Sequence, residues 1–146
     1  MTVHILIGTT SGNTEYLAES LSDQLNQQQR PTQLHDQPNI NEIPSSHATW
    51  LVCVATHGAG EFAESIDQFM HDLATQQPNL QSVRAAVVSI GDSSYDTFCQ
   101  AGIETERLLI QLGATLICDR LEIDMLVDSD PEATANAWLT SHIDRF

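Results

Sequence analysis

Lysine is absent from this sequence, and positive charge is scarce along all of it. Five arginines stand against twenty acidic residues, so the formal net charge of the 146-residue chain is −15. Nucleic acids and anionic membranes repel such a surface, whereas a basic protein is attracted to it. The composition therefore argues against nucleic-acid and membrane binding and favours a basic protein partner, with plain solubility as the alternative reading of the acidity.

Cysteines and long apolar runs are also scarce. The three cysteines are odd in number and have no CxxC spacing, which argues against a disulfide framework or a zinc site. No apolar run reaches the length of a membrane span. The first eight residues lack the basic start and cleavage site of a signal peptide. We therefore expect a cytoplasmic protein with no metal site and no membrane anchor.

Short apolar runs alternate with helical patterns along the chain. The runs that predict strands are Val3–Ile7, Thr32–His35, Trp50–Ala55, Val83–Ile90 and Leu116–Ile123. Between strands, apolar residues recur at helical spacing, as at Leu17, Leu21 and Leu25. Ser65 with Gln68 three residues later fits a capping box at the start of another helix. This alternation predicts βαβ units around a parallel sheet.

Five strands and about five helices fit a doubly wound α/β fold, a three-layer sandwich. No repeat or linker divides the chain, so we expect residues 1–146 to form a single domain. Ligands of such folds bind outside the carboxyl ends of the strands. The loops that follow the first, third and fourth strands are therefore the candidate site.

The first of these loops is rich in hydroxyl and amide groups and opens a helix. A helix N-terminus offers unpaired N–H groups and about half a positive charge. The lysine and spacing of a Walker loop are missing, so hydrogen bonds alone would hold a phosphate, each contributing roughly 1.5–3 kcal/mol. An ordinary polar helix cap is the alternative. The predicted phosphate contacts are Thr9, Thr10, Ser11, Gly12, Asn13 and Thr14.

The second and third loops suit a flat aromatic ligand. Two glycines in the second loop let the backbone approach a ring closely, and Tyr95 in the third can stack on one. The loose dinucleotide fingerprint that begins at Gly58 is rejected, because no acidic residue follows at the required distance. Ordinary polar turns are the alternative. The predicted ring contacts are Thr56, His57, Gly58, Ala59, Gly60, Gly91, Asp92, Tyr95, Phe98 and Cys99.

Together the three loops resemble those of the flavodoxin family, and most of all the MioC-type short-chain flavodoxins. The segment from Gly8 to Glu15 is similar to the family's phosphate loop almost residue for residue. Thr56-His57-Gly58 lies where the family places an aromatic residue and a glycine against the flavin. The resemblance covers essentially the whole chain. It implies a flavodoxin-like sandwich with a five-stranded parallel sheet in the order 2-1-3-4-5.

The resemblance also implies a function. The chain would bind FMN and carry single electrons between a basic-surfaced flavodoxin reductase and electron-accepting enzymes, as a monomer with no substrate turnover and no catalytic residues. The flavin ring would lie between His57-Gly58 and Tyr95, with the backbone from Asp92 to Cys99 at its pyrimidine edge. Many family members have tryptophan or tyrosine in place of His57, so we expect weaker stacking at this position.

Two other functions stay open. An FMN-dependent quinone or azo reductase needs a substrate pocket over the ring, and the chain has no insertion to build one. A flavin-free adaptor would have kept the fold and lost the cofactor, against which the intact phosphate loop argues. A receiver domain shares the fold but needs acids at the end of the first strand and a lysine after the fifth, and this chain has neither.

Overall fold

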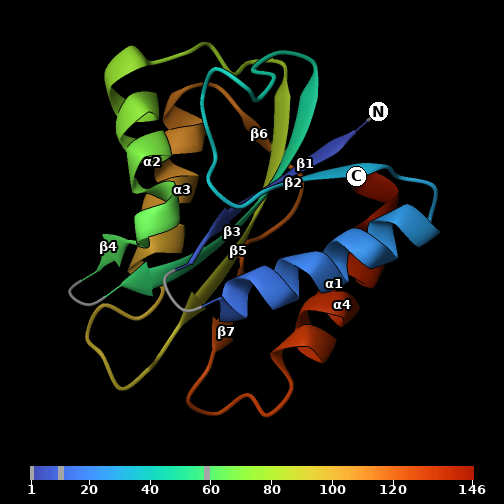
Figure 1. The fold of residues 1–146 in the computed structure, drawn as a ribbon, viewed down its shortest axis with the longest axis vertical. Helices are drawn as coiled ribbons and strands as arrows, with labels where there is room; N and C mark the ends of the chain where they lie inside the picture. The colour runs from blue at the N-terminus through green and yellow to red at the C-terminus, as the bar shows by residue number, and fades with distance from the viewer. Residues whose placement is uncertain (1, 10–11, 58–59) are drawn as a thin grey trace.

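The computed structural model describes residues 2–9, 12–57 and 60–146, and shows a twisted sheet between two layers of helices (Figure 1). The strands run in the order β2-β1-β3-β5-β6, and neighbours in this order pair in parallel. The predicted doubly wound α/β fold with order 2-1-3-4-5 is confirmed. The strands are β1 Val3–Gly8, β2 Thr32–His35, β3 Ala48–His57, β4 Glu61–Phe62, β5 Val83–Gly91, β6 Thr115–Leu116 and β7 Leu121–Asp124.

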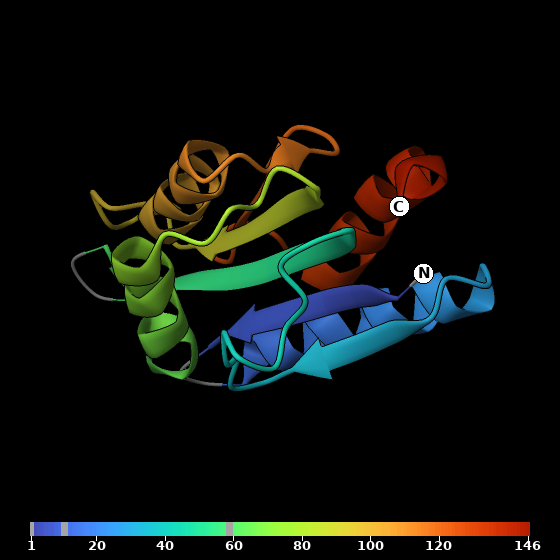
Figure 2. The ribbon, with the colours of Figure 1, turned by 90° about the horizontal axis from the view of Figure 1, so that it is seen from above.

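Helices cover both faces of the sheet, as the view from above shows (Figure 2). α2 and α3 enclose one core against the sheet, which includes Trp50 and Phe69. α1 and α4 enclose a second core on the other face, which includes Leu21 and Leu139. Within the described residues there are four α-helices where about five were expected, and none is long and apolar enough to cross a membrane. They are α1 Asn13–Gln27, α2 Glu64–Gln76, α3 Gln100–Gln111 and α4 Pro131–His142, with a final 3₁₀ turn at Ile143–Arg145.

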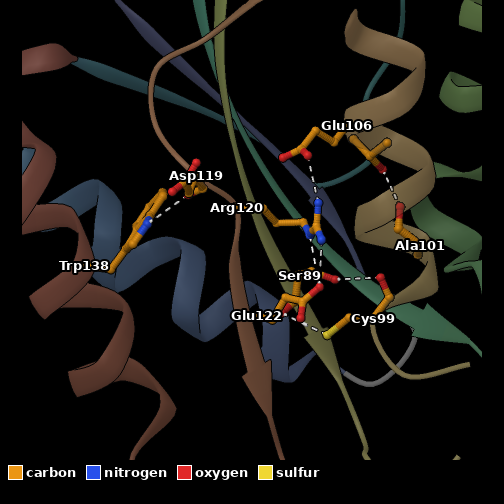
Figure 3. Close-up of polar contacts among 9 residues, drawn as sticks. Ser89, Cys99, Ala101, Glu106, Asp119, Arg120, Glu122 and Trp138 are labelled. Atoms are coloured by element: carbon orange, nitrogen blue, oxygen red, sulfur yellow. Dashed lines mark hydrogen bonds and ion pairs between the residues drawn. The ribbon is translucent and has the colours of Figure 1, made fainter.

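The fifth strand is interrupted, which the apolar pattern over 116–123 does not reveal. β6 and β7 both pair in parallel with β5, and Arg120 lies between them. The Arg120 guanidinium contacts Glu106 of α3 at 2.8 Å and Glu122 of β7 at 3.0 Å (Figure 3). This cation therefore ties the break in the strand to the neighbouring helix.

A buried pair of histidines joins β1 to the edge strand β2. His4 Nδ1 lies 3.1 Å from His35 Nε2, the rings are stacked, and the residues are only 7% and 8% exposed. Burial lowers the pKa of both rings. His4 lowers the pKa of His35 further, while Glu42 and Asp36 act in the opposite direction. Each ring is therefore held in its neutral form to a lower pH than a free histidine.

The lowered pKa values of His4 and His35 predict that the free energy of unfolding decreases as the pH is lowered. Both pKa values are lowered on folding, so the unfolded chain binds more protons than the folded chain once the pH drops below about 6.5. The free energy of unfolding then falls by up to about 1.4 kcal/mol per pH unit for each extra proton. Urea unfolding of the parent and of a His35→Gln variant, between about pH 7.5 and about pH 5.5, measures the slope. The variant should show a smaller slope. The exposed His71→Gln is the control, and equal slopes for parent and His35→Gln contradict the prediction.

Candidate functional site

Elements distant in sequence surround one cavity of about 460 Å³ at the carboxyl-terminal edge of the sheet. The first turn of α1, the ends of β3 and β5, and the loops after β5 and β7 all contribute to its wall. The predicted site residues that line it are Asn13, Thr14, Thr56, Gly91, Asp92, Tyr95 and Phe98. The candidate loops after the first, third and fourth predicted strands thus come together around a common space.

The start of α1 is open toward a ligand. Its N-cap is Gly12, which has a φ of 87° and no side chain to satisfy the N–H groups of the first turn. The Gly12 N–H itself donates to Thr9 Oγ1 at 3.0 Å. A β-carbon built on Gly12 would meet no atom of the described residues within 4 Å, its chain neighbours apart. Since a helix start of this kind carries unpaired N–H groups and positive potential, it fits an anion such as a phosphate.

Ser65 holds the first loop in place, and the capping box predicted for it is wrong. The N-cap of α2 is Ala63, without a side-chain hydrogen bond. The Ser65 hydroxyl instead donates to the Ile7 carbonyl at 3.0 Å and accepts from the Thr9 N–H at 2.9 Å. Serine three residues before glutamine is the local signal of a cap, but here the hydroxyl contacts the end of β1, 58 residues earlier in the chain, and the loop that follows it. Only the tertiary structure reveals this role.

The second loop is tied to the third through Thr56. β3 runs to His57, two residues further than predicted, and its end pairs antiparallel with β4, which the sequence did not indicate. The Thr56 hydroxyl accepts from the Ala101 N–H of α3 at 3.1 Å. Thr56 therefore caps the first turn of α3 while it lines the cavity.

Some of the predicted ligand contacts are not in the described part of the chain. Thr10, Ser11, Gly58, Ala59 and the side chain of His57 lie outside it. Gly60 is described and has a φ of 100°, and a β-carbon on it would come within 3.2 Å of the Thr97 side chain. The close approach of Gly60 to Thr97 brings the second loop against the third.

The third loop forms a tight turn that presents Tyr95. Asp92 Oδ1 accepts from the N–H and the hydroxyl of Ser94 at 2.8 and 2.6 Å, and the Asp92 carbonyl accepts from the Tyr95 N–H at 3.1 Å. The Tyr95 side chain is 61% exposed and borders the cavity. Its ring is thus available to cover a flat aromatic ligand.

The turn after β7 supports the third loop and adds a lining residue that the sequence analysis missed. Asp124 Oδ1 accepts from the N–H groups of Ser93 and Leu126 at 3.1 and 3.0 Å. Hydrogen bonds from the Ser93 hydroxyl and from these N–H groups lower the pKa of Asp124. The Met125 N–H donates to the Gly91 carbonyl at 2.8 Å, and Met125 lines the cavity. An apolar residue in a turn carries no sequence signal for this position.

Cys99 lies behind the cavity rather than in its wall. Its side chain is fully buried, and burial raises the pKa of its thiol. The thiol contacts the Ser89 carbonyl at 3.7 Å, and the Ser89 hydroxyl donates to the Cys99 carbonyl at 3.4 Å (Figure 3). A β-carbon on Gly91 would come within 2.8 Å of the Cys99 nitrogen. The thiol therefore serves the packing of α3 on β5.

The described residues that line the cavity include an acid and no cation. Arg107 and Arg120 are paired with glutamates of α3 and β7. At the other end of the sheet, Arg84 donates to the Arg145 carbonyl, and Arg30 donates to the Phe146 carbonyl. An anion at the start of α1 would therefore depend on N–H and hydroxyl groups, inside an acidic surround.

The flavodoxin family model matches residues 5–138. A MioC homologue from Haemophilus influenzae is 42% identical over 144 residues, which cover 99% of this chain and 98% of that protein. MioC from Escherichia coli is 35% identical over 141 residues, covering 97% and 95%. A solved structure of a cysteine-to-alanine mutant of flavodoxin from Pseudomonas aeruginosa matches with a TM-score of 0.91 at 26% identity, covering 99% and 98%.

These matches extend over nearly the whole chain and agree with its geometry. The resemblance depended on the residues of three loops, and the structure places described parts of these loops around one cavity, in a sheet with the strand order that the resemblance implied. The resemblance to MioC-type flavodoxins is confirmed. The chain belongs to the flavodoxin family.

Proposed function

We propose that this chain binds FMN in the cavity at the carboxyl-terminal edge of its sheet and carries single electrons between a reductase and acceptor enzymes. Membership of the flavodoxin family makes FMN its cofactor and electron transfer its function. The observation that supports the position is the cavity of about 460 Å³, which the three loops share. Its volume lies within the ≈300–1,000 Å³ typical of small-molecule sites.

In this proposal the FMN phosphate binds at the first turn of α1. The open N-cap at Gly12 leaves room for an anion there, and Ser65 fixes Thr9 beside it. Hydrogen bonds to a charged group contribute roughly 1.5–3 kcal/mol each, so a few N–H and hydroxyl donors offset the missing cation. The proposed phosphate contacts are Thr9, Thr10, Ser11, Gly12, Asn13 and Thr14.

The flavin ring, in turn, is proposed to lie against the exposed face of Tyr95. Bound FMN supplies reversible one-electron chemistry, and the residues of the chain hold and shield it. The acidic residues around the cavity oppose further negative charge on the ring, so they lower the reduction potential of the flavin. For a one-electron couple, each tenfold change in the equilibrium constant corresponds to about 59 mV. The other proposed ring contacts are Thr56, His57, Gly58, Ala59, Gly60, Gly91, Asp92, Phe98, Met125 and the Cys99 backbone.

We further propose that the chain has no substrate of its own. The neighbouring cavity beside Met125 and Tyr16 measures about 170 Å³, which is below the volume of typical small-molecule sites. A quinone or a nicotinamide has little room there beside a bound flavin. Residues 1–146 then act in the cytoplasm as one monomeric FMN domain that exchanges electrons with basic protein partners.

Replacement of Tyr95 tests the position of the ring. Tyr95→Ala is expected to raise the Kd for FMN about tenfold, because aromatic pairs contribute ≈0.5–1.5 kcal/mol beyond the area they bury. Tyr95→Phe keeps the aromatic face and should bind within about twofold of the parent. Quenching of FMN fluorescence on titration with each protein measures the Kd. Equal affinity of parent and Tyr95→Ala would mean that the ring lies elsewhere.

Absence of turnover is tested with NADH, NADPH and a soluble quinone. The FMN-loaded protein should oxidise neither nucleotide faster than free FMN at the same concentration, because the cavity beside Met125 and Tyr16 leaves little room for a substrate next to the proposed flavin. Addition of a flavodoxin reductase with NADPH should then start electron flow. Steady oxidation by the protein alone would support the quinone-reductase alternative.

A further inference from the structure

A methionine side chain is exposed to solvent beside the proposed flavin site. The sequence contains three methionines, of which Met70 and Met125 belong to the described residues. Met70 is 2% exposed and belongs to the core between α2 and the sheet, whereas Met125 is 39% exposed in the turn after β7. Since a dissolved oxidant must reach a thioether to oxidise it, Met125 is the more vulnerable of the two.

The cysteines are poorer targets for an oxidant than Met125. The thiolate is the reactive form of cysteine. Cys53 and Cys99 are fully buried, and burial raises the pKa of the Cys53 thiol to about 12 and raises the pKa of the Cys99 thiol as well. Cys118 is half-buried, and burial raises the pKa of its thiol too. Among the described residues, Met125 is therefore the most accessible sulfur group at neutral pH.

The Met125 side chain lies where a bound flavin would cover it. It lines both neighbouring cavities and shares the larger one with Tyr95. The Met125 N–H donates to the Gly91 carbonyl at 2.8 Å, and the Leu126 N–H donates to Asp124 Oδ1 at 3.0 Å. Because these bonds fix the backbone of the turn, the Met125 side chain is held in the wall of the cavity.

Oxidation changes the polarity of this part of the wall. A methionine sulfoxide carries a polar S=O group in place of an apolar thioether. The thioether packs favourably against an aromatic ring. A ring that covers the sulfoxide instead excludes water from its oxygen, and a buried acceptor without a donor destabilises the complex. Oxidised Met125 therefore opposes the binding that the thioether favours.

We propose that Met125 is a reversible oxidation site in the wall of the flavin cavity and that its sulfoxide weakens the binding of FMN. The oxidant is hydrogen peroxide. One of its oxygen atoms bonds to the thioether sulfur, the O–O bond breaks and water leaves, so the sulfur is oxidised by two electrons and the peroxide is reduced. Methionine sulfoxide reductases reverse the modification.

The inference rests on the proposed function, since it requires the flavin ring to lie against Met125. Oxidation and FMN binding then oppose each other. If the sulfoxide weakens the binding of FMN, bound FMN in turn protects the thioether from oxidation, because it covers the side chain. A flavin-free chain is therefore the form in which Met125 is oxidised.

Treatment of the 146-residue chain with hydrogen peroxide, without FMN and with FMN in excess, tests the accessibility of Met125. Peptide mass spectrometry measures the gain of one oxygen atom at Met125 and at Met70 over time. Without FMN, Met125 should be oxidised at least about tenfold faster than Met70, because it is the exposed one. FMN at about ten times its Kd should slow the oxidation of Met125 by up to about tenfold.

FMN titration before and after the peroxide treatment measures the effect on binding. The parent should bind FMN about tenfold more weakly once Met125 is oxidised, the loss expected when a buried acceptor has no partner. Met125→Leu has no thioether at this position, so peroxide should leave the Kd of this variant at the value before treatment. The matched control Met70→Leu keeps Met125 and should lose affinity like the parent. Methionine sulfoxide reductases A and B together should restore the Kd of the oxidised parent.

Four results would overturn the proposal. Faster oxidation of Met70 means that Met125 is not the accessible thioether. An oxidation rate of Met125 that FMN does not change means that the ring does not cover it. An unchanged Kd at full oxidation of Met125 means that the sulfoxide does not oppose binding. An equal loss of affinity in Met125→Leu assigns the effect to another residue.

The titration before treatment separates this test from that of the proposed function. A parent that binds no FMN before it meets peroxide refutes both. A parent that binds FMN, and binds it equally well with Met125 oxidised, refutes only the oxidation site.

Discussion

The proposed binding of a phosphate without any cation is the constraint on which this site depends. In that proposal the first turn of α1 supplies the donors, and its N-cap is a glycine on which a β-carbon would meet no described atom within 4 Å apart from its chain neighbours. That arrangement requires a fixed loop. Within the loop, Thr9 Oγ1 accepts from the Gly12 N–H, and from outside it Ser65 of α2 accepts from the Thr9 N–H. The packing of α2 on β1 is therefore part of the proposed anion site, because a shift of this helix would release the loop.

Hydrogen bonds between different elements fix the other walls of the cavity. Thr56 caps α3, which couples the end of β3 to the loop after β5, and Asp124 and Met125 couple that loop to the turn after β7. These bonds run between backbone and side chains of different elements, so the walls are set by the sheet and its helices rather than by each loop alone. The bond from Ser93 to Asp124 also fixes the loop that presents Tyr95, where the proposed cofactor needs it.

Sequence reasoning is strong wherever the signal is local. Apolar runs give β1, β2 and β5 nearly at their observed bounds, and the hydroxyl-rich stretch before Asn13 marks the helix start that opens toward the cavity. It fails where a residue acts across the fold. Ser65 reads as a cap because its partner on β1 is invisible locally, and the break around Arg120 depends on two glutamates of other elements. Met125 carries no chemical signal at all until the turn after β7 is placed beside Gly91.

The central claim is that the start of α1 binds the phosphate of FMN, and a comparison of FMN with riboflavin tests it most directly. The two ligands share the ring and differ in the phosphate, so titration of the parent with each isolates that group. Loss of even one hydrogen bond to the phosphate, worth roughly 1.5–3 kcal/mol, should weaken riboflavin binding by at least about tenfold. Tight FMN and weak riboflavin binding is the predicted result, and equal affinity for the two would contradict the account.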